Sequence, residues 1–352
     1  MSARFPGPTW LALDVGGANL KAAHSGGEAR SLPFELWKQP DELPRGLARL
    51  LSTLPQADRV ALTMTAELCD CYPTKAFGVL AVIDATLAAL NGRLVAIWGV
   101  DGRFHAVDVV RRDPALAAAA NWLALATVAA RLVPEGPGLL IDVGSTTTDL
   151  IPLAGGRVAV RGRTDTDRLR TGELVYAGVR RTPLCSLARE LPFRGEPTGL
   201  TAELFATTLD IYLTLGAVAA DPADLSPADG RPATLEAARD RMARMVGADR
   251  DGFSPEDALA FARDADAVLV DRLVGAAERV ALATVGRPVA AVVAGSGEFL
   301  ARRVAERILA PGGRIISLAD AWGPVASSSA CALALVRLAA EQAEAGGMES
   351  LG

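Results

Sequence analysis

Two segments of the chain combine acids, glycines and hydroxyl side chains in an order suited to binding phosphate. The first reads LALDVGGANLK over residues 11–21, and the second reads LLIDVGSTTTDL over residues 139–150. Each begins as an apolar run that predicts a buried strand, reaches an aspartate, and turns through glycine and Ser/Thr residues into a second strand. Glycine lets the backbone approach phosphate oxygens, hydroxyls add donors, and aspartates can hold Mg²⁺ or orient its waters. We therefore expect two hairpins that face one phosphate chain.

A third segment, AVVAGSGEFL over residues 291–300, predicts a strand that breaks at Gly-Ser-Gly and enters a helix. A helix N-terminus favours anions. The segment reads Gly-x-Gly-x-x-Leu and lacks the third glycine of a dinucleotide-binding turn, and no P-loop pattern occurs in the chain. Ordinary glycine-rich turns would explain any one of the three segments, but phosphate binding explains all three together.

The composition predicts a compact enzyme that does not bind nucleic acid or membrane. The chain has 352 residues, half of them hydrophobic, and a formal net charge of −5, without a basic run or a long apolar span. Its four cysteines are expected as reduced thiols, and two histidines are too few for a histidine-rich metal centre. Acid, lysine, arginine and Mg²⁺ chemistry remain. We expect a cytoplasmic protein acting on small molecules, with a homo-oligomer left open.

The hydrophobic pattern divides the chain into two α/β lobes with a ligand cleft between them. The first lobe spans residues 1–133 and includes a crossing helix over 115–132, and the second spans 134–326 with a largely helical insertion at about 200–286. A last helix, 327–345, is expected to return to the first lobe. Strands are predicted at 10–15, 19–24, 60–65, 94–99, 139–143, 148–153 and 290–294, and helices at 41–54 and 78–90.

The three phosphate segments, in this order, resemble the phosphate-1, phosphate-2 and adenosine motifs of the actin, sugar kinase and Hsp70 superfamily. The resemblance implies a two-lobed, ribonuclease H-like α/β fold whose cleft holds Mg²⁺, with ATP or ADP as a further ligand. It assigns Asp14, Asp142 and Asp149 to the metal and its water shell. The ligand-binding positions that it implies are Asp14, Gly16, Gly17, Asn19, Gly144, Ser145, Thr146, Thr147, Gly295, Ser296, Gly297 and Glu298.

Three further segments are similar to a narrower group, the hydantoinase/oxoprolinase-related proteins tied to tetrahydromethanopterin-linked one-carbon metabolism. They read TMTAELCDCYPTKAFGV over 63–79, AANWLALA over 119–126 and GELVYAGVRRTP over 172–183. Within that group the chain resembles condensing synthases of methanofuran or methylofuran biosynthesis. The resemblance implies a transferase that joins a diphosphate-activated aminomethylfuran to the phenol oxygen of a γ-glutamyltyramine or tyrosine acceptor and releases diphosphate. The phosphate hairpins would then hold a leaving group.

The polar residues of these segments are candidates for the acceptor side. A phenol with a pKa near 10 needs a base or a neighbouring cation, and Glu67, Asp70 and Lys75 could supply either. A surface ion pair is the plainer alternative. The remaining candidates are Lys21 as a leaving-group cation, and Tyr176, Arg180 and Arg181 as substrate-binding residues on a lobe-closing loop, where solvated charge is the alternative. Trp122, on an apolar helix, is expected in the core.

Two other function classes stay open. The first segment lacks the Thr-rich Asp-x-Gly-Gly-Thr-x-Thr-Asp of hydantoinase-type ATPases, which disfavours hydantoin or oxoproline cleavage. Asn19 and Lys21 resemble the pattern of hexokinase-type sugar kinases, so an ATP-dependent small-molecule kinase or ATPase is the first alternative. A non-catalytic nucleotide-sensing protein is the second.

Overall fold

The first sheet carries the first phosphate hairpin at its centre. The computed structural model describes residues 8–90, 92–323, 327 and 329–345. The strands of this sheet pair in the order β3-β2-β1-β4-β5-β6, with β1 antiparallel to β2 and parallel to β4. Their bounds are β1 Trp10–Val15, β2 Asn19–His24, β3 Ala29–Pro33, β4 Arg59–Met64, β5 Leu94–Trp98 and β6 Phe104–Ala106.

Side chains of these strands point alternately to the two faces of the sheet, and both faces are buried. Leu11, Leu13 and Val15 of β1 pack on one face with helices α1 (Leu43–Leu51) and α2 (Lys75–Leu90). Trp10 and Ala12 point to the other face and join a second apolar cluster. Short helical segments border the sheet: η1 Leu36–Lys38, η2 Pro40–Glu42, η3 Ala66–Leu68, α3 Val107–Arg112 and η4 Pro114–Ala117.

The second sheet repeats the arrangement around the second hairpin. Its order is β10-β8-β7-β13-β14, with β9 paired to β8, and the parallel β13 carries the third phosphate segment. The strands are β7 Pro137–Val143, β8 Thr148–Ala154, β9 Arg157–Val158, β10 Leu174–Val175, β13 Ala290–Ala294 and β14 Arg314–Ser317. Its helices are α5 Asp165–Thr171, α9 Pro255–Thr284, α10 Glu298–Ile308 and α11 Leu318–Trp322. This pair of sheets, each with a central hairpin, is the two-lobed actin-like architecture.

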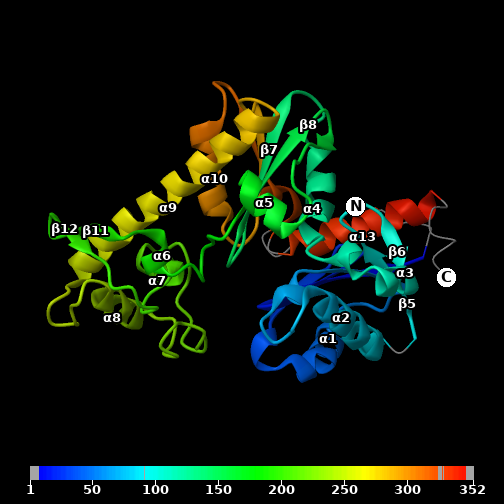
Figure 1. Ribbon diagram of the computed structural model, residues 1–352, viewed down its shortest axis with the longest axis horizontal. Coiled ribbons are helices and arrows are strands. Elements are labelled where there is room, and N and C mark those ends of the chain that lie inside the picture. Colours follow the sequence, from blue (N-terminus) through cyan, green and yellow to red (C-terminus); the bar gives the residue numbers. More distant parts are fainter. Residues whose placement is uncertain (1–7, 91, 324–326, 328, 346–352) are drawn as a thin grey trace.

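Two apolar helices lie between the sheets and share one core. Helix α4 (Asn121–Ala130) contacts β7, β8 and β9, whereas α13 (Ala330–Glu344) contacts β1, β2 and β4, and the two helices pack against each other where they cross (Figure 1). Their shared cluster joins Trp10 of the first sheet to Leu140 and Val292 of the second. The lobe boundary at residue 133 stays an expectation, because this core belongs to both sheets. Residue 328 of the expected last helix lies outside the described residues.

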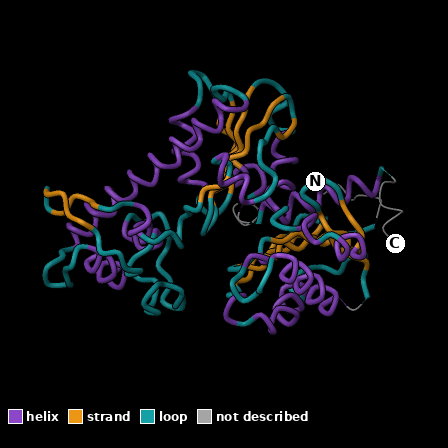
Figure 2. The backbone as a smooth tube through the Cα atoms, in the orientation of Figure 1, coloured by secondary structure: helices purple, strands orange, loops and turns teal. Residues whose placement is uncertain are grey.

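A helical extension stands out from the second lobe at the far end of α9. Figure 2 shows this long helix running between the extension and the second sheet. The extension contains α6 Leu184–Leu187, the hairpin β11 Glu190–Phe193 and β12 Glu196–Gly199, α7 Thr208–Thr214 and α8 Leu235–Met245. Ser254 caps α9 and Pro255 opens it, so the start of this helix is set locally.

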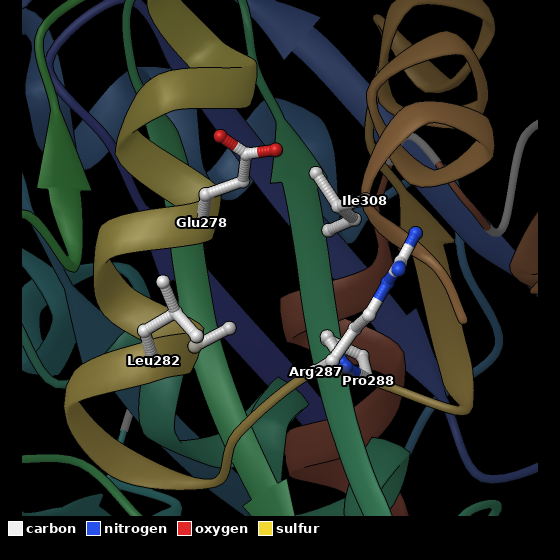
Figure 3. A pocket seen from close by; sticks show the side chains of 6 residues that line it. Glu278, Leu282, Arg287, Pro288 and Ile308 are labelled. Carbon is white, nitrogen blue, oxygen red and sulfur yellow. The ribbon is translucent and has the colours of Figure 1, made fainter.

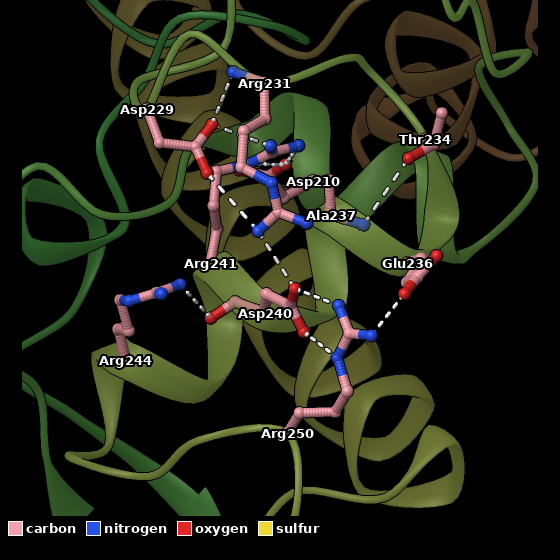
Figure 4. A network of polar contacts seen from close by, with 10 residues as sticks. All are labelled: Asp210, Asp229, Arg231, Thr234, Glu236, Ala237, Asp240, Arg241, Arg244 and Arg250. Atoms are coloured by element: carbon pink, nitrogen blue, oxygen red, sulfur yellow. Dashed lines mark hydrogen bonds and ion pairs between the residues drawn. The ribbon is translucent and has the colours of Figure 1, made fainter.

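A network of ion pairs joins α7, α8 and the loop between them in the extension (Figure 4). The guanidinium of the buried Arg241 donates from two nitrogens to Asp210 at 2.6 and 2.8 Å and from the third to Asp229 at 3.0 Å. Arg250 and Arg231 both donate to Asp240, and the hydrogen bond from Arg250 lowers the pKa of Asp240 to about 2. The network fixes the loop over residues 221–233, which reaches back to the phosphate hairpins as described below.

The strands that were expected are present within one or two residues, and one expected helix is wrong in its first third. Residues 114–117 form a separate 3-10 turn, the chain turns at Ala119 with φ of 51°, and α4 begins only at Asn121. The strands at 29–33, 104–106 and 314–317 were not predicted from the sequence. Within the described part of the chain, no helix combines the length and apolar character needed to cross a bilayer.

Candidate active site

The two phosphate hairpins have the same backbone geometry. In each, the first glycine after the strand donates its N–H back across the turn: Gly16 to the carbonyl of Asn19 at 3.0 Å, and Gly144 to that of Thr147 at 2.8 Å. The acid that ends the first strand of each hairpin faces its second strand, with Asp14 opposite Lys21 and Asp142 opposite Asp149. The two turns thus present corresponding N–H groups, as the sequence repeat predicts.

Glycines outside the second hairpin allow other segments to close on its turn. A Cβ at Gly178 would lie 2.5 Å from the carbonyl oxygen of Gly144, so only glycine fits there. Gly295, with φ of +93°, lies against Val143 in the same way, which brings the third phosphate segment to this turn. Ser296 is exposed beside it. The second turn, the 172–183 segment and the Gly-Ser-Gly turn therefore form one surface.

Two of the three metal-candidate aspartates already have partners. Asp14 is buried, accepts from Asn121 Nδ2 at 3.3 Å and lies 3.8 Å from Lys21 Nζ. Burial raises the pKa of Asp14, and the charge of Lys21 opposes this. Burial would lower the pKa of Lys21, but the charges of Asp14, Asp142 and Asp149 act together against it and the pKa is raised. Asp149 accepts from Arg168 Nη2 at 2.6 Å.

Asp142 is the carboxylate of the three that has the fewest partners among the described residues. Burial raises the pKa of Asp142 to about 7, and the charge of Asp149 adds to the shift while Lys21 opposes it. No group of three or more acid, cysteine or histidine side chains in the described ranges is close enough to hold a metal alone. Mg²⁺ in phosphate sites keeps several waters and takes only one or two carboxylates. The residues therefore fit an Mg²⁺ ion that keeps most of its waters, with Asp142 as the least paired of the three candidate carboxylates.

The first turn of α4 contacts the acid of the first hairpin directly and that of the second through Arg168, which the sequence did not reveal. Asn121 donates to Asp14, and the ring of the neighbouring Trp122 lies 4.1 Å beneath the guanidinium of Arg168, which pairs with Asp149. Trp122 is in the core, as predicted, and is also a support for this arginine. Arg168 was missed because it is one of several charged residues of α5, and only its 1% exposure distinguishes it.

Glu67 is a buried carboxylate without a hydrogen-bond partner. It is 1% exposed, and neither carboxylate oxygen has a partner within the described residues. Burial raises the pKa of Glu67 to about 7, the charge of Asp165 adds to this, and Lys75 opposes it. Burial of a carboxyl group without a partner lowers the stability of the fold, and buried acids with strongly shifted pKa values are typical of functional sites. Asp70, three residues later, is exposed.

Lys75 and Tyr176 lie near Glu67 and connect it to the second lobe. Lys75 Nζ is 3.4 Å from Asp165 Oδ2, at the start of α5. Tyr176 is half-exposed, and its pKa is raised by burial and by the charges of Asp165 and Glu67. The residues 67, 75, 165 and 176 thus gather at the same place between the lobes. The surface ion pair considered for Lys75 exists, but it joins the two lobes.

The remaining charged candidates differ in whether a described residue already pairs with their charge. They are Arg180, Arg181 and Glu298. Arg180 is paired with Asp224 of the extension, in the loop that the ion-pair network holds. Arg181 stacks on the ring of Trp37 at 4.4 Å. Glu298 accepts from the backbone N–H of Ala319 at 3.0 Å and from two serine hydroxyls, so its carboxylate anchors the start of α11.

A cavity of about 280 Å³ lies elsewhere, between the C-terminal end of α9 and the end of α10 (Figure 3). Glu278, Leu282, Arg287 and Pro288 line it. It lies before β13 begins, whereas the phosphate turn at Gly295 follows the other end of that strand. The cavity and the candidate active site therefore lie at opposite ends of the second sheet.

Comparison with known proteins supports the family suggested by the motifs. Residues 58–341 match the hydantoinase/oxoprolinase family. A protein of Methanocaldococcus jannaschii named (4-{4-[2-(gamma-L-glutamylamino)ethyl]phenoxymethyl}furan-2-yl)methanamine synthase is 36% identical over 255 residues, 72% of this chain and 76% of that protein. A Methanococcus vannielii protein of the same name is 32% identical over 142 residues, 40% of this chain and 64% of that protein.

Solved structures of similar shape have low sequence identity. The PilM-PilN type IV pilus biogenesis complex matches 93% of this chain and 97% of its own at a TM-score of 0.47 and 12% identity. Acetone carboxylase matches 86% of this chain but 46% of its own chain, at a TM-score of 0.45 and 12% sequence identity. The strand order and the family match, over most of the chain, carry the assignment. The chain belongs to the hydantoinase/oxoprolinase family.

Proposed function

We propose that this protein is a transferase that condenses a diphosphate-activated aminomethylfuran with the phenol oxygen of a γ-glutamyltyramine or tyrosine acceptor. The product would be the phenoxymethylfuran amine in the name of its relatives. The observation that carries the proposal is the unpartnered Glu67 carboxylate in η3, which follows β4 at the same edge of the first sheet as the Gly16-Gly17 turn that follows the parallel β1. An alkyl transfer to a phenol needs both parts: a base for the proton and a site for the departing diphosphate.

The bond changes follow from these two parts. The bond from the furan CH₂ to the diphosphate oxygen breaks, and the phenol oxygen forms the new bond to that CH₂. The electron-rich furan stabilises positive charge on the carbon as the diphosphate leaves. Glu67 takes the phenol proton, and its pKa of about 7 suits proton transfer near neutral pH.

The diphosphate side is supplied by the hairpin turns. The N–H groups of Gly17, Ser145 and Thr146, which have no acceptor among the described residues, would bind its oxygens, and Lys21 adds positive charge beside them. Bound Mg²⁺ would neutralise charge on the leaving group, with Asp142 as its freest carboxylate ligand. The Gly295-Ser296-Gly297 turn would bind the outer phosphate or, in the kinase alternative, a nucleotide.

Access of the acceptor to Glu67 requires movement between the lobes. Both Glu67 oxygens are shielded from water in this conformation, and the Lys75–Asp165 pair joins the lobes beside them. We expect the acceptor to enter when this pair separates. Tyr176, half-exposed at the same place, would then contact the acceptor ring.

Mass spectrometry of the reaction products tests the proposal. The purified protein is incubated with Mg²⁺, the aminomethylfuran diphosphate and γ-glutamyltyramine, without ATP, in parallel with an ATP-only sample. We expect an ether product and equimolar diphosphate, both reduced at least 100-fold in Glu67→Gln and retained in Asp70→Asn. Absence of the ether in wild type, or ADP formation with an alcohol substrate instead, would refute the transferase.

A further inference from the structure

Arg181 is fixed by its backbone to the second phosphate turn. Its N–H donates to the carbonyl oxygen of Ser145 at 3.0 Å, and the N–H of Arg180 donates to the same oxygen at 3.0 Å. The neighbouring Gly178 packs directly on this turn, as its missing Cβ requires. The start of the Arg181 side chain is therefore set by the same turn that is expected to bind phosphate.

The other end of the Arg181 side chain lies at the first phosphate turn. Its guanidinium carbon is 4.4 Å from the ring centroid of Trp37, in η1. The preceding residue, Leu36, donates its N–H to the carbonyl oxygen of Gly17 at 3.0 Å, so η1 is attached to the first hairpin. Arg181 thus extends from one phosphate turn to the other and crosses from the second lobe to the first.

Most of the other cations around the site are already paired with a carboxylate. Lys21 lies 3.8 Å from Asp14, Lys75 lies 3.4 Å from Asp165, Arg168 lies 2.6 Å from Asp149, and Arg180 contacts Asp224. Within the described ranges Arg181 has no carboxylate partner and no side-chain hydrogen bond, only its stacking on Trp37. Stacking holds a guanidinium flat while leaving its five N–H donors free for another acceptor.

We propose that Arg181, held flat by Trp37, is the side chain that binds the diphosphate as it leaves and links the two turns around it. This inference rests on the proposed function for the identity of the anion. A planar fork of N–H donors matches two phosphate oxygens at once, and a charged donor is most effective where negative charge develops. Lys21, which is paired with Asp14, then adds positive charge beside the site, and Arg181 contacts the leaving group directly.

The inference has a direct test in the binding of inorganic diphosphate, without the furan substrate. Isothermal titration with Mg²⁺ and diphosphate gives Kd for wild type, Arg181→Gln, Arg181→Lys and Trp37→Leu. The matched control is Arg189→Gln, an exposed arginine of the same lobe whose side chain makes no hydrogen bond or ion pair with the described residues. The unfolding midpoint of each variant is measured alongside.

We expect Arg181→Gln to weaken diphosphate binding by about 10- to 100-fold, as loss of a charged hydrogen-bonding group does. Arg181→Lys keeps the charge but loses the planar pair of N–H donors, so its Kd should lie between those of Arg181→Gln and wild type. Trp37→Leu should weaken binding by about 2- to 5-fold through loss of the stack. Arg189→Gln should bind as wild type, and the midpoints of all the variants should stay within a few degrees of it.

Three outcomes would overturn the inference: wild type that does not bind diphosphate, an Arg181→Gln variant with unchanged Kd, or an equal loss in Arg189→Gln. A normal Kd for inorganic phosphate together with a weakened Kd for diphosphate in Arg181→Gln would further support a role in linking two phosphate groups. Because the titration contains no furan or phenol, it separates the two proposals. Arg181-dependent diphosphate binding without ether formation would refute the transferase and leave the Arg181 site standing.

Discussion

Replacing Glu67 by glutamine should stabilise the protein at alkaline pH and not at acid pH. The folded protein holds the Glu67 proton up to about pH 7, whereas the unfolded chain releases it near 4.5. Between these values the folded state binds more protons, so the stability of wild type falls as pH rises through this window. The Glu67→Gln variant carries no proton to lose and lacks this fall.

The expected size follows from the same two pKa values. Each pH unit of difference corresponds to about 1.4 kcal/mol, which gives about 3 kcal/mol between pH 4.5 and pH 8 as an upper limit. Glutamine also brings an amide that must find partners in the same buried place, and this cost does not change with pH. The diagnostic quantity is therefore how the stability difference between variant and wild type changes with pH. Asp142 titrates in both proteins and cancels from that difference.

Urea unfolding at pH 5, 6, 7 and 8 measures this difference, with Asp70→Asn as the exposed control. We expect the free energy of unfolding of Glu67→Gln to rise relative to that of wild type by about 2 to 3 kcal/mol from pH 5 to pH 8. The difference between Asp70→Asn and wild type should stay constant over the same range. The rate of ether formation in wild type should rise with pH through about 7, as the base loses its proton. A stability difference that is the same at every pH would refute the assignment of a protonated, unpartnered Glu67.

Three further perturbations test the arrangement of the phosphate site. Arg168→Met should lower the free energy of unfolding by about 3 kcal/mol in urea unfolding because it leaves the partly buried Asp149 carboxylate unpaired. The exposed Arg170→Met should cost under 1 kcal/mol, and equal losses would contradict the role of the Arg168–Asp149 pair. Gly178→Ala should push the second phosphate turn aside and weaken diphosphate binding at least 10-fold by titration, while Gly199→Ala, where a Cβ meets nothing, should bind as wild type. Mg²⁺ should strengthen diphosphate binding more at pH 8 than at pH 6, in part because the metal displaces a proton from Asp142, whose pKa is about 7. This pH effect should be smaller in Asp142→Asn than in wild type, and an equal effect in the two would assign it to the diphosphate itself or to another group.

Much of the phosphate site was predictable from the sequence because hairpins are local. The residues that make the two turns are neighbours in the chain, and glycine has few other reasons to follow a buried strand and an acid. The same holds for the Gly-Ser-Gly turn that opens α10. The functions of these residues remain predictions, but their positions in the fold agree with the pattern.

The local pattern failed where packing overrode it. The alanine-rich run from residue 115 has high helix propensity throughout, yet the chain turns at Ala119 so that α4 can begin beside the hairpins. The short strand at 314–317 carries little alternation and forms because β13 offers a free edge.

Sequence alone determined the family, the two hairpins and the list of acids and cations that could act, since residue type and short spacing are enough to define them. Tertiary structure decided which of these acids and cations are already paired with a neighbouring charge and which are not. Packing of α2 against η3, at Gly78, buries Glu67 away from any partner, and the approach of the lobes pairs Lys75 with Asp165 and lays Arg181 on Trp37. Charge pairing depends on distances between residues that are far apart in the chain, so no local pattern contains it.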